Sequence, residues 1–174
     1  MLQHGARRVY GIDVGYGQTA WSLRIDERVV LKERTNLRRL TATELYGPED
    51  DLPTLAVADV SFISLSLVLP AIRALLEPRG SEALVLVKPQ FEVGRDRVGK
   101  GGVVRDGSAH RDALASVIDS AHSLGWNALG VVGSPITGPA GNHEYLLWLS
   151  ELEPHQISDE KIREVIQDTL RSEG

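Results

Sequence analysis

Two apolar stretches decide the fold: Leu-Ala-Val-Ala-Asp at residues 55–59 and Ala-Leu-Val-Leu-Val-Lys at residues 83–88. Each is a short, continuous apolar run that ends in a charged residue, which is typical of a strand buried on both faces of a sheet. Similar runs indicate further strands at residues 9–14, 29–31, 128–132 and 145–149. The sequence therefore predicts a sheet built from these segments.

Amphipathic segments separate the strands and predict helices at residues 19–24, 65–76, 109–124 and 159–171. In the third helix, Ser108 is placed to cap the start and Gly125 to end the helix. Pro70 is expected to kink the second helix or to mark its first turn. Strands that alternate with helices indicate βαβ units, so we expect a parallel sheet in a doubly wound, Rossmann-like α/β fold.

The composition fits one globular domain. Of the 174 residues, 42% are hydrophobic and 25% are charged, which is a globular balance and not a disordered one. No apolar run is long enough to span a membrane, and no signal peptide is evident. Cysteine is absent and the five histidines show no metal-ligand spacing, so we expect neither a disulfide scaffold nor a metal site.

The net charge of −5 argues against a nucleic-acid binder held by bulk charge alone. A local basic face remains compatible with it, because residues 151–174 carry seven acids against three bases and leave the body nearly neutral. The glycine-rich stretch at residues 94–107 is one such region. It contains GxxxxGK, but Gly101 stands where a P-loop has its Mg²⁺-binding hydroxyl, so we reject nucleotide hydrolysis.

Residues 91–111 contain five bases and three acids on a glycine-rich loop. Such a loop suits contact with a phosphate backbone, and it also suits a plain solvated loop. The candidate phosphate-contacting bases are Arg95, Arg97, Lys100 and Arg105.

Asp13 follows the first strand in Gly-Ile-Asp-Val-Gly-Tyr-Gly at residues 11–17. Ligands of open α/β sheets bind at the carboxyl ends of strands, where an aspartate can accept hydrogen bonds from ribose hydroxyls. Gly15 and Gly17 would let a nucleoside approach the backbone. The alternative is a tight turn in which Asp13 caps a helix. The spacing is not GxGxxG, which argues against a nicotinamide dehydrogenase.

Lys88 ends one buried strand, Asp59 ends another, and Glu144 opens the last strand. Taken singly, they also suit a solvent-directed lysine, a helix cap and a surface carboxylate. Taken together, they place two carboxylates and one amine at strand ends of a single sheet. Acids beside a lysine orient it and stabilise its charged form, so the three residues are candidates for acid–base work.

Six segments resemble the TlyA/hemolysin A family, in order and in one register. The segments are residues 13–18, 33–36, 58–65, 87–94, 101–106 and 134–145. The resemblance implies a cytoplasmic, S-adenosylmethionine-dependent 2′-O-methyltransferase that acts on cytidines of ribosomal RNA in both ribosomal subunits, with the fold of FtsJ-type enzymes. It also implies a catalytic Lys-Asp-Lys-Glu tetrad.

By motif, Asp59, Lys88 and Glu144 correspond to the Asp, the second Lys and the Glu of that tetrad. The resemblance implies that Lys88 takes or orients the proton of the ribose 2′-hydroxyl, with Asp59 and Glu144 holding the site. It also implies a set of residues that contact the cofactor. These are Asp13, Gly15, Tyr16, Gly17, Asn36, Asp59 and Phe62.

The family also carries an N-terminal S4-like RNA-binding domain, the first tetrad lysine and a glycine-rich loop around the methionine end of the cofactor. Residues 1–5 resemble the end of the helix that follows that loop. We therefore expect residues 1–150 to be a partial catalytic domain whose sheet lacks its first strand, and residues 151–174 to be an acidic helical tail. The alternatives are a non-catalytic remnant that binds RNA or a partner chain, and a lytic, hemolysin-like protein.

Overall fold

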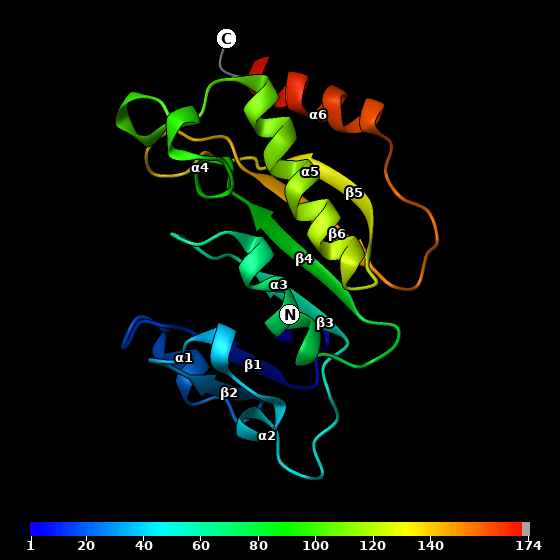
Figure 1. The fold of residues 1–174 in the computed structure, drawn as a ribbon. Coiled ribbons are helices and arrows are strands. Elements are labelled where there is room, and N and C mark those ends of the chain that lie inside the picture. Colours follow the sequence, from blue (N-terminus) through cyan, green and yellow to red (C-terminus); the bar gives the residue numbers. More distant parts are fainter. Residues whose placement is uncertain (172–174) are drawn as a thin grey trace.

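The computed structural model describes residues 1–171 (Figure 1). The last three residues of the expected tail lie outside this range. The strands are β1 (Val9–Ile12), β2 (Val29–Lys32), β3 (Leu55–Ala58), β4 (Glu82–Val87), β5 (Asn127–Gly133) and β6 (Tyr145–Ser150). The α-helices are α1 (Trp21–Arg24), α2 (Ala42–Leu45), α3 (Leu69–Ala74), α4 (Pro89–Glu92), α5 (Gly107–Ser123) and α6 (Asp159–Arg171). All of the expected strands are present, so the mixed α/β class is confirmed.

The strands form two sheets. The pair β1-β2 is parallel, and the larger sheet has the order β3-β4-β6-β5. Strand β6 runs antiparallel to both of its neighbours, so the prediction of an entirely parallel sheet is wrong at this strand. The reason is the connection: β5 and β6 are joined by a loop without a helix, whereas parallel neighbours need a long crossover.

A cavity of about 370 Å³ lies between β1 and β3. Tyr10 and Ile12 of β1 line one side, and Leu55 and Val57 of β3 line the other. Strand β1 pairs with β2 and β3 with β4, and no ladder joins β1 to β3. The two sheets are therefore separate, and this cavity lies between them.

The core lies under one face of the four-stranded sheet. Along β4 and β6, alternate residues such as Val85 and Leu147 are fully buried and pack with apolar residues of α5. Val57 and Trp148 are exposed. The expectation of strands buried on both faces is therefore wrong for β3, β4 and β6. The helices α3, α5 and α6 pack in one continuous core on one face of these strands (Figure 1).

The helix ends follow local chemistry. Asp106, not the expected Ser108, caps α5, and its carboxylate accepts a hydrogen bond from the Ser108 backbone N–H at 3.0 Å. Gly125 follows the helix with φ +87°, where a residue without Cβ is favoured. The expected helix at residues 65–76 is a 3₁₀ turn followed by α3, with Pro70 in the first turn of α3. Among residues 1–171, no helix combines the length and apolar character needed to cross a membrane.

Candidate active site

The side chains of Lys88 and Asp59 meet at the carboxyl ends of β4 and β3. These strands are parallel neighbours, so both chains leave the sheet at the same edge. The Lys88 Nζ lies 2.6 Å from the Asp59 Oδ1 and donates a hydrogen bond to the Ser61 Oγ at 2.9 Å. The Lys88 side chain is only 12% exposed, whereas that of Asp59 is 66% exposed. The result is a sheltered amine beside an accessible carboxylate.

Glu144 lies beside this pair but contacts it indirectly. The antiparallel register pairs Val87 with Tyr145, which places the chain at Glu144 next to the end of β4. The Glu144 side chain is buried, and its Oε1 accepts a hydrogen bond from the Gln90 Nε2 at 3.0 Å. Within the described residues, no ion pair joins Glu144 to Lys88. Gln90 therefore connects Glu144 to the segment that carries Lys88.

Phe62 has the most unusual conformation near the pair. Its φ of +63° is rare for an aromatic residue, and its side chain is 91% exposed. Its ring centroid lies 5.1 Å from that of Phe91, which follows Lys88 along the chain. A strained backbone that holds an apolar ring in solvent beside a polar cluster is typical of a ligand contact.

The Asp13 loop is held by its own carboxylate and by the loop after β2. The Asp13 Oδ1 accepts a hydrogen bond from the Gly15 N–H at 2.7 Å, so the tight-turn alternative is part of the observed geometry. The Thr35 N–H donates to the Asp13 carbonyl and the Arg34 N–H donates to the Gly15 carbonyl, each at 2.9 Å. The second carboxylate oxygen of Asp13 has no such role in the turn and can accept from a ligand.

The remaining predicted cofactor contacts differ in availability. Tyr16 is exposed, and the Arg34 guanidinium lies 4.2 Å from its ring centroid. Gly17 has φ +76° and donates its N–H to the Glu33 Oε1 at 2.8 Å. The Asn36 side chain already accepts a hydrogen bond from the Arg38 N–H and caps a 3₁₀ turn. The Asn36 Oδ1 is thus engaged in this turn.

The sequence model of the FtsJ-like methyltransferase family matches residues 1–151. The chain belongs to the FtsJ-like methyltransferase family. The sequence resemblance to the TlyA/hemolysin A group is confirmed by relatives bearing both names. The family assignment also replaces the nicotinamide dehydrogenase alternative.

Two curated relatives illustrate the match. The chain is 46% identical over 174 residues to TlyA of Mycobacterium tuberculosis, which is named a 16S/23S rRNA (cytidine-2'-O)-methyltransferase. It is 40% identical over 147 residues to Hemolysin A of Brachyspira hyodysenteriae. These alignments cover 100% and 84% of this chain but 63% and 59% of the relatives. The chain therefore spans less than two thirds of their length.

Two solved structures resemble this chain in fold. A protein from Streptococcus thermophilus is 40% identical with a TM-score of 0.89, covering 97% of this chain and 60% of its own. A SAM-dependent methyltransferase from Methanosarcina mazei is 14% identical with a TM-score of 0.52, covering 83% of this chain and 82% of its own. The second likeness shows the fold alone.

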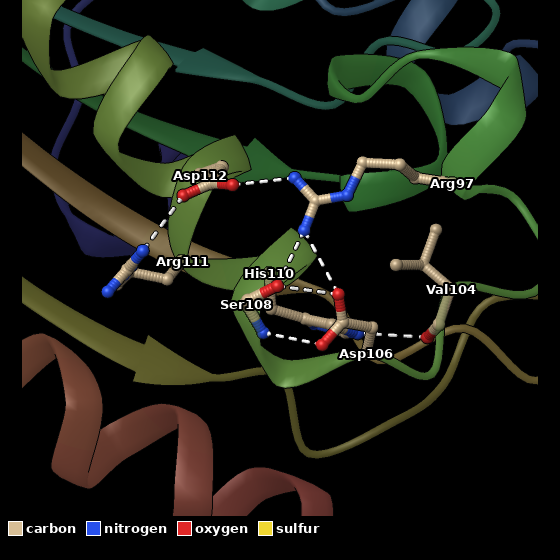
Figure 2. Close-up of polar contacts among 7 residues, drawn as sticks. All are labelled: Arg97, Val104, Asp106, Ser108, His110, Arg111 and Asp112. Atoms are coloured by element: carbon tan, nitrogen blue, oxygen red, sulfur yellow. Dashed lines mark hydrogen bonds and ion pairs between the residues drawn. The ribbon is translucent and has the colours of Figure 1, made fainter.

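The glycine-rich loop of this FtsJ-like chain is tied to the start of α5 through Arg97. Its guanidinium forms ion pairs with Asp106 at 3.0 Å and with Asp112 at 2.6 Å, and it also donates to the Ser108 Oγ at 2.7 Å (Figure 2). The positive charge of Arg97 is therefore largely compensated by these two carboxylates. The other predicted bases of the loop are exposed, and within residues 1–171 none of them forms an ion pair. These are Arg95, Lys100 and Arg105.

Asn142 fastens the glycine-rich loop to the segment that precedes Glu144. Its Oδ1 accepts a hydrogen bond from the Val104 N–H at 3.0 Å, and its Nδ2 donates to the Gly102 carbonyl at 2.8 Å. Asn142 is buried. The loop that carries the candidate RNA-contacting bases is thus connected to the segment that carries Glu144, directly before β6.

Sequence reasoning missed four residues that complete the site: Ser61, Gln90, Glu92 and Asn142. Ser61, Gln90 and Asn142 each lie two residues from a predicted catalytic residue, so their proximity along the chain was an available signal. Glu92 and Asn142 make their contacts across 27 or more residues of sequence, and no local pattern indicates such partners.

Proposed function

We propose that this chain carries the catalytic part of a 2′-O-methyltransferase that acts on cytidines of ribosomal RNA and takes its methyl group from S-adenosylmethionine. The observation that carries the proposal is the Lys88–Asp59 pair at the ends of two neighbouring strands of an FtsJ-like sheet. Residues 1–150 form the proposed catalytic part and residues 151–174 the tail. A ribosomal substrate places the protein in the cytoplasm.

The proposed chemistry needs one sheltered amine and good positioning. When bound, S-adenosylmethionine supplies an electrophilic methyl group on a sulfonium. With cofactor and RNA bound, the Lys88 Nζ would hydrogen-bond the ribose 2′-hydroxyl and would orient it or take its proton. Asp59 holds the amine through their contact at 2.6 Å. Because the methyl group is already activated, alignment of the 2′-oxygen supplies much of the rate.

Glu144 acts in this scheme through Gln90. Their hydrogen bond of 3.0 Å fixes the chain directly after Lys88, and the buried carboxylate cannot move without breaking it. Asp59 and Glu144 thereby restrain the lysine from two sides. This assigns the three predicted catalytic residues one reactive role and two supporting roles.

The residues present fit the cofactor. Asp13 keeps one carboxylate oxygen for ribose hydroxyls, and a Cβ at Gly17 would meet no atom within 4 Å, so the backbone there is open to a ligand. Tyr16 and Phe62 are exposed aromatic rings suited to stacking on a base. The proposed cofactor contacts are Asp13, Gly15, Tyr16, Gly17, Asn36, Asp59 and Phe62.

RNA contact is proposed for the exposed bases of the glycine-rich loop, with Arg97 acting chiefly as their support. Arg95, Lys100 and Arg105 present positive charge on a loop tied to Glu144 through Asn142. Lys and Arg contacts to phosphates position a nucleic acid without reading its sequence. The loop would therefore orient the RNA, while the strand ends select the ribose.

The test is calorimetric titration of S-adenosylmethionine into the purified chain, followed by transfer of labelled methyl groups to ribosomal RNA. We expect Lys88→Ala to abolish transfer and to leave cofactor binding intact, and Asp59→Asn to lower both. Lys161→Ala is the control, because Lys161 lies on α6 and pairs with Glu164. RNA binding without cofactor binding would instead establish the non-catalytic alternative.

A further inference from the structure

Glu92 joins the two loops that carry the candidate catalytic pair. It is the last residue of α4, the short helix that begins directly after Lys88. Its Oε1 accepts a hydrogen bond from the Leu65 N–H at 2.8 Å, and its Oε2 accepts one from the Ser64 Oγ at 2.6 Å. Ser64 and Leu65 end the loop that starts at Asp59. One carboxylate therefore receives two hydrogen bonds from the far end of that loop.

The hydroxyl groups around Glu92 have a defined direction. Ser64 has one hydroxyl proton, and an ionised carboxylate can only accept, so Ser64 donates to Glu92. The Ser64 Oγ also lies 2.6 Å from the Ser66 Oγ and accepts from the Ser66 N–H at 3.2 Å. The proton of the Ser66 hydroxyl consequently points toward Ser64. The carboxylate of Glu92 thus sets the donor direction of both hydroxyls: Ser66 donates to Ser64, and Ser64 donates to Glu92.

Three contacts span the same two loops. Lys88 meets Asp59 and Ser61 near the start of the loop, and the rings of Phe62 and Phe91 lie 5.1 Å apart at its middle. Glu92 fixes its far end. Among these three contacts, only that of Glu92 places two hydrogen bonds on one carboxylate. It makes no hydrogen bond to the Lys88 amine. It can therefore set the loop position without taking part in the chemistry.

We propose that Glu92 is a positioning residue, whose carboxylate fixes the 59–64 loop so that Asp59 and Ser61 hold the Lys88 amine in place. The assignment rests on the proposed function, because that function makes Lys88 the reactive group. Burial raises the pKa of Glu92, while the hydrogen bonds from Leu65 and Ser64 lower it. Burial of the Glu92 carboxylate is unfavourable unless hydrogen bonds compensate for it, and the bonds from Leu65 and Ser64 provide this compensation.

The test measures Lys88 itself and needs neither cofactor nor RNA. The full chain is pulse-labelled with an amine-acylating reagent at fixed pH, and the labelling rate of each lysine is read by mass spectrometry. Lys161 is the internal reference, because it lies on α6 away from the site. The variants are Glu92→Ala and Glu92→Gln, with Glu153→Ala as the matched control at an exposed glutamate. Ser64→Ala removes only the hydroxyl half of the contact.

We expect Lys88 to be labelled about threefold faster in Glu92→Ala, because a partly exposed ion pair is worth well under a tenfold effect. Glu92→Gln should keep the wild-type rate, since an amide oxygen still accepts from the Leu65 N–H. Unchanged Lys88 labelling in a folded Glu92→Ala chain would overturn the proposal, as would equal acceleration at Lys161. If Glu92→Ala does not fold, Ser64→Ala carries the same test. The labelling test does not depend on methyl transfer, so an inactive chain would disprove the proposed function without affecting this result.

Discussion

The hydroxyl of Tyr145 lies 2.8 Å from the Nδ1 of His110, and both side chains are buried. The opposite ring nitrogen, Nε2, lies 2.9 Å from the Val104 carbonyl, which can only accept. The Nε2 of His110 therefore carries the proton, and Tyr145 donates to Nδ1. This arrangement satisfies both ring nitrogens of a neutral imidazole. It also ties the glycine-rich loop to β6.

Stability is expected to fall between pH 7.5 and pH 5.5, and His110 should contribute to the fall. Burial lowers the pKa of His110 below its ordinary value of 6.5, and the Val104 carbonyl opposes this. A depressed folded-state pKa means that the unfolded chain binds the proton first, so stability is lost as pH falls below about 6.5. His143 and Asp106 also act on this ring, lowering and raising its pKa respectively. In urea unfolding at the two pH values, His110→Gln should show a smaller pH difference than wild type. An equal difference would assign the effect to other groups.

Gly138→Ala is expected to disturb Glu144. A Cβ at this position would lie 2.7 Å from the Glu144 Oε1, the atom that accepts from Gln90. We expect a loss of about 1 kcal/mol in the free energy of unfolding, measured by urea denaturation. Gly130→Ala is the matched control in β5, where the added Cβ would lie 4.0 Å from the Trp148 ring. That change should be neutral or slightly stabilising. The same sign in both variants would contradict this account of Gly138.

Asn142→Ala is expected to loosen the glycine-rich loop. It removes an acceptor for the Val104 N–H and a donor to the Gly102 carbonyl, so we expect a loss of about 1–3 kcal/mol. Hydrogen exchange at the Val104 amide should accelerate by more than global unfolding explains. Asn127→Ala is the control, because the Asn127 side chain donates an exposed hydrogen bond to the Glu153 carbonyl. Equal losses in the two variants would show that Asn142 has no special role.

The bases of the glycine-rich loop are expected to separate into two groups in RNA binding. Lys100→Ala should lower the slope of log affinity against log salt concentration by roughly 0.7 to 0.9, the value of one phosphate contact. Arg97→Ala should change this slope less and destabilise the start of α5, because its charge is paired with Asp106 and Asp112. Fluorescence anisotropy with a ribosomal RNA fragment across a salt series measures both. A larger slope change for Arg97→Ala would refute the division.

The sequence predicted the strands because each apolar run is bounded by charged or turn-forming residues. It also placed Asp59 and Lys88 correctly at the strand ends that meet. The direction of β6 was missed, although the helix-free connection at residues 134–144 carried that information. The one-sided burial of β4 could not be read from Ala-Leu-Val-Leu-Val, because every position in it is apolar. Which face is covered depends on where α5 and α6 pack.

The site was predictable where its residues follow strands and unpredictable where distant segments cross. The cap formed by Asn36 illustrates the limit: its place after β2 suggests a ligand contact and does not indicate that its Oδ1 also caps the next turn. Glu92 illustrates the reverse, since an acidic residue four positions beyond Lys88 looks like part of a solvated helix end. Its partners at Ser64 and Leu65 lie on another strand-to-helix loop, and only tertiary packing brings them together.

The break between β1 and β3 divides the proposed cofactor contacts between two bodies. Asp13 belongs to the two-stranded sheet and Asp59 to the four-stranded one. A hydrogen bond from the Tyr46 hydroxyl to the Leu75 carbonyl, at 2.6 Å, is one of the links that brace the two bodies against each other. A ligand that contacts both carboxylates would bridge the two sheets, so its affinity depends on how firmly the sheets are held against each other. Tyr46→Phe, which removes this hydrogen bond, is therefore expected to lower the affinity of such a ligand.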